Sequence, residues 1–230
     1  MQLTVRDVSR LMKVPEKTVY RWVKSEGLPA VEINEQYHFN RAELLEWATS
    51  RNFDVPADLF QSPQTESFAL PDFVEALSAG GIFYRIPGAD KESILRSVVG
   101  VMILPPHVDR VLMLNMLLAR EALETTAVGE GVAIPHPRNP IVLRVRQPQI
   151  TLCFLEKPVD FGALDGRPVH ALFILVSPTP KIHLHLLSRL SYCLHQPEFK
   201  EVIAGQAEAG TILDKARRLV SAASAARPAS

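Results

Sequence analysis

Hydrophobic positions along the chain follow two different spacings. Apolar side chains recur every three to four residues in some segments, which predicts amphipathic helices, and form short β-rich runs in others, which predicts strands. In the longer, C-terminal part the helical spacing covers residues 91–102, 107–124, 182–195, 198–204 and 212–222. The strand-like runs there are residues 82–86, 150–155 and 170–176. This mixture predicts a sheet covered by helices.

The first 25 residues carry a separate pattern of two helices. Thr4 stands three residues before Asp7, a capping pair that predicts a helix starting near Val5. Residues 12–15 interrupt this helix, and residues 16–25 form a second one. The side chains expected to face inward from the second helix are Val19, Trp22 and Val23.

A strand pair and a third helix follow. Residues 31–39 form two short β-rich runs around residues 34–36, which predicts a hairpin in the position of a wing. Asn40 and Glu43 then form a capping pair for a third helix that ends near Trp47. The order of helix, helix, hairpin and helix predicts a small domain of its own.

The second helix presents one basic side. Lys17, Arg21 and Lys24 lie at positions i, i+4 and i+7, so their charges share one side of the helix, and Thr18 and Tyr20 lie nearby. A helix that enters a DNA groove needs such a side. These five residues are therefore the candidate DNA-binding residues.

Several short motifs of this domain are similar to one known class. They are LTVRDV at 3–8, TVYRWV at 18–23, GLP at 27–29, YHF at 37–39 and LLEW at 44–47. Together they resemble the excisionase and MerR type of winged helix-turn-helix domain. The resemblance implies a second helix in the major groove, with flanking phosphate contacts. Glu32 and Glu35 in the wing would repel phosphate, which leaves docking to a protein as the alternative.

Composition predicts a linker between two domains, and the balance of charges limits how the protein could bind DNA. Pro, Gln and Ser accumulate in residues 54–69, which predicts an exposed linker. We therefore expect a winged helix-turn-helix domain at 1–53, a larger domain at 70–222 and a flexible tail at 223–230. Lys and Arg total 25, the same number as Asp and Glu, so DNA binding would depend on a local basic patch.

The chain has no feature that predicts export or membrane insertion. It lacks the charged-then-apolar start of a secretory signal, and its apolar runs are far shorter than the roughly 20 residues that a membrane span needs. We expect a cytoplasmic protein. Cys153 and Cys193 lie in apolar segments, which favours buried reduced thiols over a disulfide or a metal site.

The stretch GEGVAIPH at residues 129–136 carries the most chemical information. Two glycines permit a tight backbone path, and Pro135 stiffens the approach to His136. An imidazole near neutral pH is a nucleophile that can accept a phosphoryl group without a metal or other cofactor. Thr125, Thr126 and Arg138 are the candidate phosphoryl-binding residues, through two hydroxyls and a guanidinium.

His183 and His185 lie two residues apart in the 182–195 helix, so they face different sides of it. His183 heads the apolar stripe that continues through Leu187 and Leu190, and it falls in the first turn, where free amides and the helix dipole favour an anion. We therefore expect His183, and not His185, at a buried site. The same spacing argues against a metal held by the two histidines.

The larger domain is also similar to a known family. The motifs are REAL at 120–123, TTAVGEGVAIPH at 125–136, VDF at 159–161, LDGRPV at 164–169 and HLHLLS at 183–188. They resemble the enzyme IIA domain of the mannitol/fructose and nitrogen-regulatory class of the bacterial phosphotransferase system. The resemblance implies a three-layer α/β/α fold with a mixed sheet. It also implies that His136 is phosphorylated by the histidine-containing phosphocarrier protein and that His183 assists.

Two departures from the family pattern lie beside the predicted site: Ala127 replaces a usual Gly, and Pro137 removes a backbone donor next to His136.

Taken together, the two domains predict a regulatory protein whose phosphorylation state is coupled to a DNA-binding module. One alternative is a phosphocarrier that serves a separate IIB sugar-transport component and uses the N-terminal domain for docking. Another is a DNA-binding protein whose second domain senses without transferring phosphate.

Overall fold

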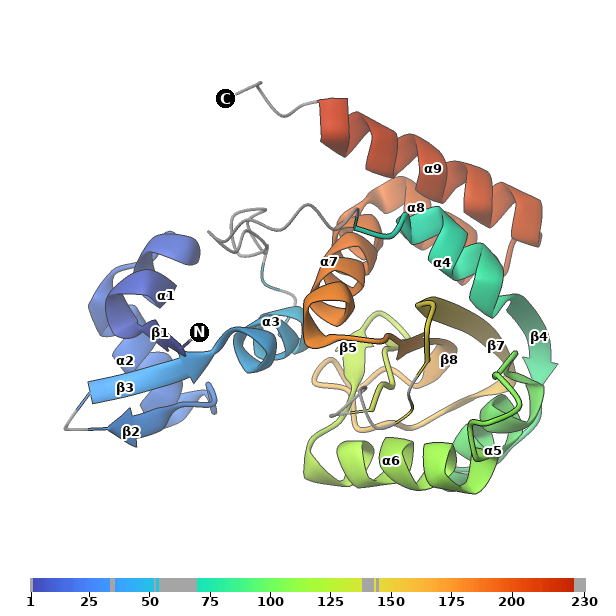
Figure 1. Ribbon diagram of the computed structural model, residues 1–230, viewed down its shortest axis with the longest axis horizontal. Helices are drawn as coiled ribbons and strands as arrows, with labels where there is room; N and C mark the ends of the chain where they lie inside the picture. Colours follow the sequence, from blue (N-terminus) through green and yellow to red (C-terminus); the bar gives the residue numbers. More distant parts are fainter. Residues whose placement is uncertain are drawn as a thin grey trace. The chain divides into compact units, whose positions relative to one another are not determined.

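The chain divides into two compact units, Met1–Ser67 and Phe68–Ser230 (Figure 1). A computed structural model describes residues 2–33, 36–51, 53, 70–137, 143 and 145–225. The expected linker at 54–69, Arg138 and residues 226–230 therefore lie outside the described residues.

The first unit combines three helices with a small antiparallel sheet. Its strands pair in the order β1-β3-β2. The elements are β1 (Gln2–Thr4), α1 (Val5–Leu11), α2 (Glu16–Ser25), β2 (Val31–Ile33), β3 (Gln36–Asn40) and α3 (Arg41–Ser50). The hairpin of β2 and β3 is the expected wing, so the winged helix-turn-helix arrangement is confirmed.

Local sequence explains how these helices begin and what holds them together. The side chain of Thr4 accepts a hydrogen bond from the amide of Asp7, whose carboxylate accepts one from the amide of Thr4, so the predicted capping pair forms. Trp22 of α2 and Trp47 of α3 pack with their ring centroids 5.1 Å apart. Trp47 is buried in the core, and α3 continues past it to Ser50.

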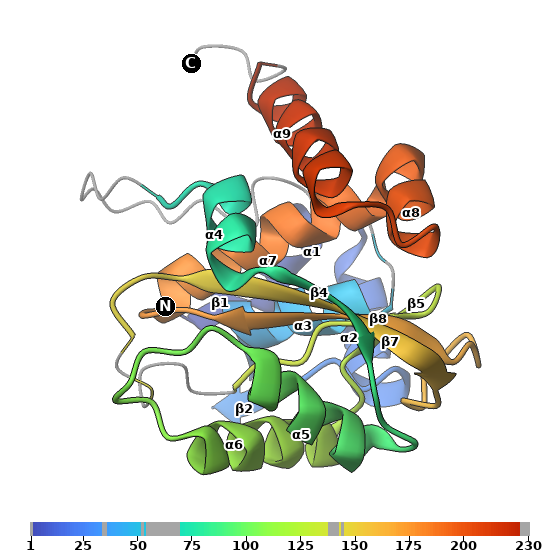
Figure 2. The same ribbon diagram turned by 90° about the vertical axis from the view of Figure 1, so that its right-hand side faces the viewer.

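The second unit is a sheet between two helical layers (Figure 2). Its strands are β4 (Ile82–Ile86), β5 (Ala127–Gly129), β6 (Val132–Ala133), β7 (Gln149–Val159) and β8 (Val169–Val176). Its helices are α4 (Phe73–Gly80), α5 (Lys91–Val101), α6 (Arg110–Leu123), α7 (Pro180–His195), α8 (Pro197–Ala204) and α9 (Ala209–Ala225). Helices α5 and α6 cover one face of the sheet, and α4, α7 and α9 lie on the other.

The sheet is mixed, as expected. Its order is β4-β7-β8-β6-β5, with β4 parallel to β7 and β6 parallel to β8, whereas β7–β8 and β5–β6 are antiparallel. Strands β7 and β8 are buried on both faces because helices cover the sheet from both sides. Cys153 and Leu155 of β7 join the apolar core beneath α5 and α6.

Several elements differ from the sequence-based expectation. Helix α4 was not expected, and strands β5 and β6, at three and two residues, are too short to leave a period in the sequence. Helix α6 begins at Arg110 rather than 107, because the Asp109 side chain caps it by accepting from the amide of Val111 at 2.7 Å. Helix α9 runs to Ala225, into the segment expected to be a tail.

Both cysteines are buried free thiols. Burial raises the pKa of Cys153 and of Cys193 to about 12, so neither is a thiolate at neutral pH. Among the helices of the described residues, none has the length and apolar character that crossing a membrane requires.

Candidate functional site

The turn between β5 and β6 sets the backbone path to His136. Gly129, Glu130 and Gly131 all have positive φ, at +88°, +52° and +76°. A Cβ on Gly131 would lie 2.3 Å from Nδ1 of His170, so only glycine fits there. The carbonyl of Gly131 accepts hydrogen bonds from the amides of His170 and Ala171, at 2.8 and 3.2 Å, which join this turn to β8.

Polar side chains brace the same turn from outside. The amide of Glu130 donates to the carboxylate of Asp165 at 2.7 Å, and the Glu130 carboxylate pairs with Lys200 of α8 at 2.7 Å. Burial would raise the pKa of Asp165, but hydrogen bonds from the amides of Glu130 and Arg167 outweigh it, and the pKa is lowered. Asp165 thus stays ionised, and its carboxylate continues to accept the hydrogen bond from the amide of Glu130.

His136 follows β6 and is held from two sides. The carbonyl of Pro135 accepts from the amide of Leu175 at 3.3 Å, which ties the backbone to β8. Nδ1 of His136 lies 2.7 Å from the carbonyl oxygen of Ile134, and a carbonyl can only accept, so Nδ1 carries the hydrogen. In the neutral ring the lone pair therefore lies on Nε2. The side chain is buried, with 3% of the residue exposed.

His183 of α7 faces His136. The ring centroids are 4.9 Å apart at an angle of 46°, and His183 is 5% exposed. His185 does not join them: it is half-buried on another side of α7, where burial lowers its pKa against an opposing hydrogen bond with the backbone of Pro71. The structure thus brings His136, predicted from the glycine-rich motif, together with His183, the one of the two α7 histidines that the helical spacing favours.

The start of α7 differs from expectation in its hydrogen bonds. The side chain of Thr179 caps the helix by accepting from the amide of Ile182 at 3.2 Å, and its carbonyl accepts from the amide of His183 at 2.9 Å. Pro180, the first helical residue, has no amide hydrogen. The amides of Ile182 and His183 are therefore already paired within the helix cap, and are not free to bind an anion as the sequence suggested.

The two threonines expected to bind the phosphoryl group have other partners. The Thr125 hydroxyl donates to the carbonyl of Phe161 at 2.5 Å, and the Thr126 hydroxyl donates to the carboxylate of Glu121 at 2.6 Å. Each hydroxyl would have to give up this bond before it could donate to a phosphoryl oxygen. Arg138, the third expected residue, lies outside the described part of the chain.

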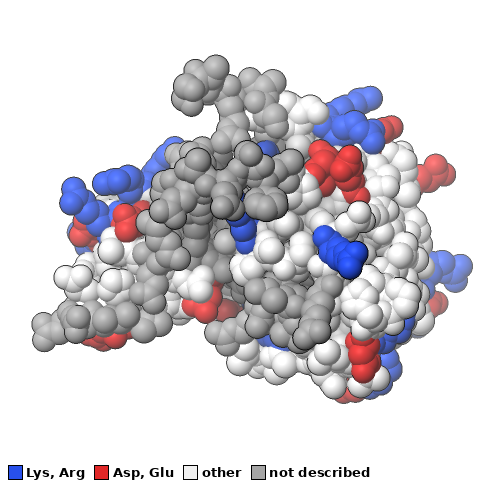
Figure 3. All heavy atoms as spheres, viewed as in Figure 1, with Lys and Arg blue, Asp and Glu red and all other residues white. Residues whose placement is uncertain are grey.

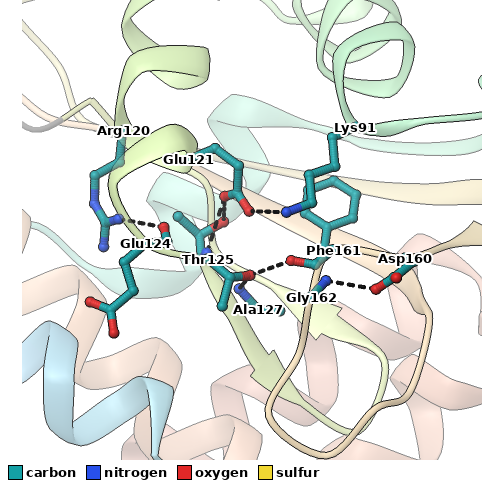
Figure 4. Close-up of polar contacts among 10 residues, drawn as sticks. Lys91, Arg120, Glu121, Glu124, Thr125, Ala127, Asp160, Phe161 and Gly162 are labelled. Atoms are coloured by element: carbon teal, nitrogen blue, oxygen red, sulfur yellow. Dashed lines mark hydrogen bonds and ion pairs between the residues drawn. The ribbon is translucent and has the colours of Figure 1, made fainter. Parts of the chain in front are cut away.

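A partly buried ion pair beside the two threonines was not foreseen (Figure 4). The Glu121 carboxylate lies 3.3 Å from Nζ of Lys91, which in turn sits 5.7 Å from the ring centroid of Phe161. The neighbouring Arg120 is also buried, and its guanidinium donates to the carbonyl of Glu124 at 2.9 Å. The sequence did hold a signal, because Glu121 falls four residues after Leu117 on the apolar stripe of α6.

In the first unit, α2 presents the expected polar side. Lys17, Tyr20, Arg21 and Lys24 are exposed and Thr18 is half-buried. Arg21 forms an ion pair with Glu26 at 3.4 Å, a contact that sequence spacing did not suggest. The Tyr20 ring packs against Tyr37 of the wing, with centroids 6.0 Å apart.

The surface carries no dominant charge on the side in view. Basic and acidic side chains are interspersed over its described residues (Figure 3). In the wing, Glu32 is exposed, as the sequence suggested, and Glu35 lies outside the described residues. An attraction to DNA would thus need a local group of cations, such as the exposed Lys17, Arg21 and Lys24 of α2.

Two family models match the chain, one for each unit. Residues 75–215 match the model described as "Phosphoenolpyruvate-dependent sugar phosphotransferase system, EIIA 2". Residues 3–52 match a model described as "Helix-turn-helix domain".

Known proteins are similar to the second unit. The nitrogen regulatory protein of Pseudomonas aeruginosa is 32% identical over 130 residues, which cover 55% of this chain and 82% of that protein. The fructose-specific EIIABC component of Bacillus subtilis is 30% identical over 143 residues, 61% of this chain and 22% of that longer protein. The crystal structure of nitrogen regulatory protein IIA-Ntr from Neisseria meningitidis is 27% identical, with a TM-score of 0.54, and the match covers 62% of this chain and 97% of that one.

Proposed function

The chain belongs to the EIIA 2 family of the phosphoenolpyruvate-dependent sugar phosphotransferase system, and we propose that it accepts a phosphoryl group on Nε2 of His136. The proposed donor is a histidine-containing phosphocarrier protein. The observation that carries the proposal is the 2.7 Å contact between Nδ1 of His136 and the carbonyl of Ile134. Because that contact keeps the hydrogen on Nδ1, it directs the nucleophilic lone pair to Nε2.

The transfer exchanges one phosphorus–nitrogen bond for another. Nε2 of His136 attacks the phosphorus of the carrier's phosphohistidine, a new P–N bond forms, and the old P–N bond breaks with its electron pair returning to the carrier's imidazole. His183, whose ring centroid lies 4.9 Å from that of His136, donates a hydrogen bond to a phosphoryl oxygen. The dipole of α7 adds a favourable potential for the same negative charge.

We propose that the first unit gives this phosphorylation a regulatory output through DNA. The helix-turn-helix match and the exposed cations of α2 support a second helix that enters the major groove. The phosphorylation state of His136 would then report flux through the phosphotransferase system to a promoter. The similarity to nitrogen regulatory proteins supports a regulatory role over a purely metabolic one.

Phosphorylation can be tested directly with purified components. Incubation with phosphoenolpyruvate, enzyme I and the phosphocarrier protein should add one acid-labile phosphoryl group, read by intact mass. His136→Ala should remain unmodified, because it lacks the nucleophile. Full labelling of that variant would refute the assignment. A wild-type protein that stays unlabelled would instead favour a domain that senses without transferring phosphate.

The two histidines of α7 should respond differently in the same assay. His183→Ala should slow labelling by about 10- to 1000-fold, because a donor to the phosphoryl group is lost while the acceptor remains. His185→Ala, on another side of α7, is the matched control and should stay near the wild-type rate. The reverse ranking would show that the wrong histidine has been placed beside the phosphoryl group.

A second candidate role for the first unit is docking to a protein, for example to the IIB component of a sugar transporter. The Arg21–Glu26 ion pair and the exposed Glu32 favour it, because both reduce the attraction to phosphate. If the unit binds DNA, the affinity should fall steeply with salt and be lost in the Lys17→Ala/Arg21→Ala/Lys24→Ala variant. Unchanged operator binding by this folded triple variant would support docking instead.

A further inference from the structure

We propose that Glu121 is a positioning residue for His136. Through Thr126 and Ile134 it holds the carbonyl that fixes the tautomer of His136, and so it determines which ring nitrogen is presented to the phosphoryl donor. This inference rests on the proposed role of His136 as phosphoryl acceptor.

The first step is the contact between Glu121 and the residue before β5. One carboxylate oxygen, Oε2, accepts hydrogen bonds from both the amide and the hydroxyl of Thr126, at 3.0 and 2.6 Å. The other oxygen, Oε1, lies 3.3 Å from Nζ of Lys91. With 8% of the residue exposed, Glu121 thus has a partner for each oxygen and holds Thr126 at two points.

The second step runs from Thr126 to the imidazole. The carbonyl of Thr126 accepts from the amide of Ile134 at 2.9 Å, across the antiparallel pair of β5 and β6. The carbonyl of Ile134 is the one that lies 2.7 Å from Nδ1 of His136. A continuous series of hydrogen bonds therefore leads from the buried carboxylate to the imidazole. The coupling along it is positional, because the N–H and C=O of Thr126, and likewise those of Ile134, belong to adjacent peptide groups whose places are fixed together by the backbone.

The free-energy cost of burying the Glu121 carboxylate supports a role for it in positioning other groups, beyond filling space in the core. A buried charge is stabilising only when it is fully paired, and an apolar side chain in its place is often at least as stable. Leu117, one turn earlier on the same stripe, shows that this face of α6 accepts apolar residues. The ammonium group of Lys91 also lies over the ring of Phe161. The backbone carbonyl of Phe161 accepts a hydrogen bond from the hydroxyl of Thr125. The carboxylate of Glu121 therefore holds the residue at which the path to His136 begins, Thr126.

The test compares Glu121→Gln with Glu124→Gln in the full-length protein. The amide of Gln has a single acceptor, so it cannot satisfy Thr126 and face Lys91 without placing its NH₂ group against the ammonium. Glu124 is the exposed C-cap residue of the same helix, and its carboxylate takes no part in this series of contacts. The two readouts are the His136 tautomer, from ¹⁵N chemical shifts of the imidazole, and the rate of phosphoryl transfer.

Wild type and Glu124→Gln should show a single tautomer with the hydrogen on Nδ1. Glu121→Gln should show a mixture of both tautomers and transfer about 10- to 100-fold more slowly, because the nucleophile is no longer held in one orientation. The Lys91→Gln/Glu121→Gln variant should recover the tautomer, since the amide of residue 91 can accept from that of residue 121 and leave an oxygen for Thr126. A folded Glu121→Gln protein with the wild-type tautomer and rate would overturn the proposal.

If Glu121→Gln fails to fold, Thr126→Val decides the question. This isosteric change leaves Lys91 and Glu121 in place and removes only the hydroxyl contact at 2.6 Å. Because Glu121 still accepts from the amide of residue 126, the tautomer of His136 should shift in the same direction but by less than in Glu121→Gln, and an unchanged tautomer would overturn the proposal. The tautomer is measured without any phosphoryl donor. A failure of the wild type to become phosphorylated would therefore count against the proposed function, and not against the role of Glu121 in orienting the ring.

Discussion

A single methyl group at residue 131 would collide with the histidine that packs against the turn before His136. Gly131 combines φ of +76° with a Cβ position 2.3 Å from Nδ1 of His170, whereas Gly166 has φ of +69° and open space around it. Gly166→Ala therefore measures the backbone strain alone, about 1 to 2 kcal/mol. Gly131→Ala adds the collision and should cost about 2 to 5 kcal/mol of unfolding free energy in urea denaturation. Equal losses in the two variants would show that the turn can move away from His170.

The half-buried histidines of the second unit should make its stability depend on pH. Burial lowers the pKa of His170, against an opposing hydrogen bond with the backbone of Ile203, and burial also lowers the pKa of His185. The folded state then binds fewer protons than the unfolded state, so stability decreases as the pH falls through the ordinary value of 6.5 toward the lowered ones. His170→Gln/His185→Gln should flatten this decrease.

Urea denaturation at a series of pH values measures the effect. His107→Gln, at an exposed position, is the control for removing a histidine. If the double variant loses stability with acid as steeply as the wild type, the two histidines do not account for the decrease.

At the scale of single elements, α4 depends on its cap. Its apolar residues run almost continuously over only eight positions, which is why the spacing did not predict a helix. The Asp72 side chain accepts from the amides of Val74 and Glu75 at 2.8 and 2.9 Å. Asp72→Ala should lower the free energy of unfolding by about 1 kcal/mol, and Asp72→Asn, which keeps an acceptor, by less. Equal losses in the two variants would show that the charge, rather than the hydrogen bonds, stabilises α4.

At the scale of the whole molecule, the open question is whether the two units share a signal. The chain has a formal net charge of zero, and a phosphoryl group would add roughly −1.5 to −2 charges. If the added negative charge competes with DNA for the exposed cations of α2, phosphorylation should weaken DNA binding by about 5- to 150-fold, the size of an ordinary allosteric coupling. Operator affinity of unmodified, phosphorylated and His136→Ala protein at one salt concentration tests this. Three equal affinities would mean that the units act independently.

The sequence by itself determined the features that short-range spacing controls. The capping pair of Thr4 and Asp7, the basic side of α2 and the separation of His183 from His185 all follow from the period of a helix, because residues three or four apart share a face. The glycines on either side of Glu130 likewise predicted the tight turn before His136, where the structure has positive φ values. In each case the residues that interact lie within a few positions of one another.

Only the tertiary structure decided which polar groups meet across elements. Lys91 and Glu121 are 30 positions apart, and Glu130 and Lys200 are 70 apart, so no local pattern pairs them. The hydroxyls of Thr125 and Thr126 look available in the sequence, yet a buried donor must find a partner, and the packing of α6 and the segment before Gly162 supplies one for each. The short strands β5 and β6 exist because β8 lies alongside β6 and its amides donate to the carbonyls of Gly131 and Pro135 on either side of β6. This pairing is a property of the assembled sheet rather than of the residues of β5 and β6.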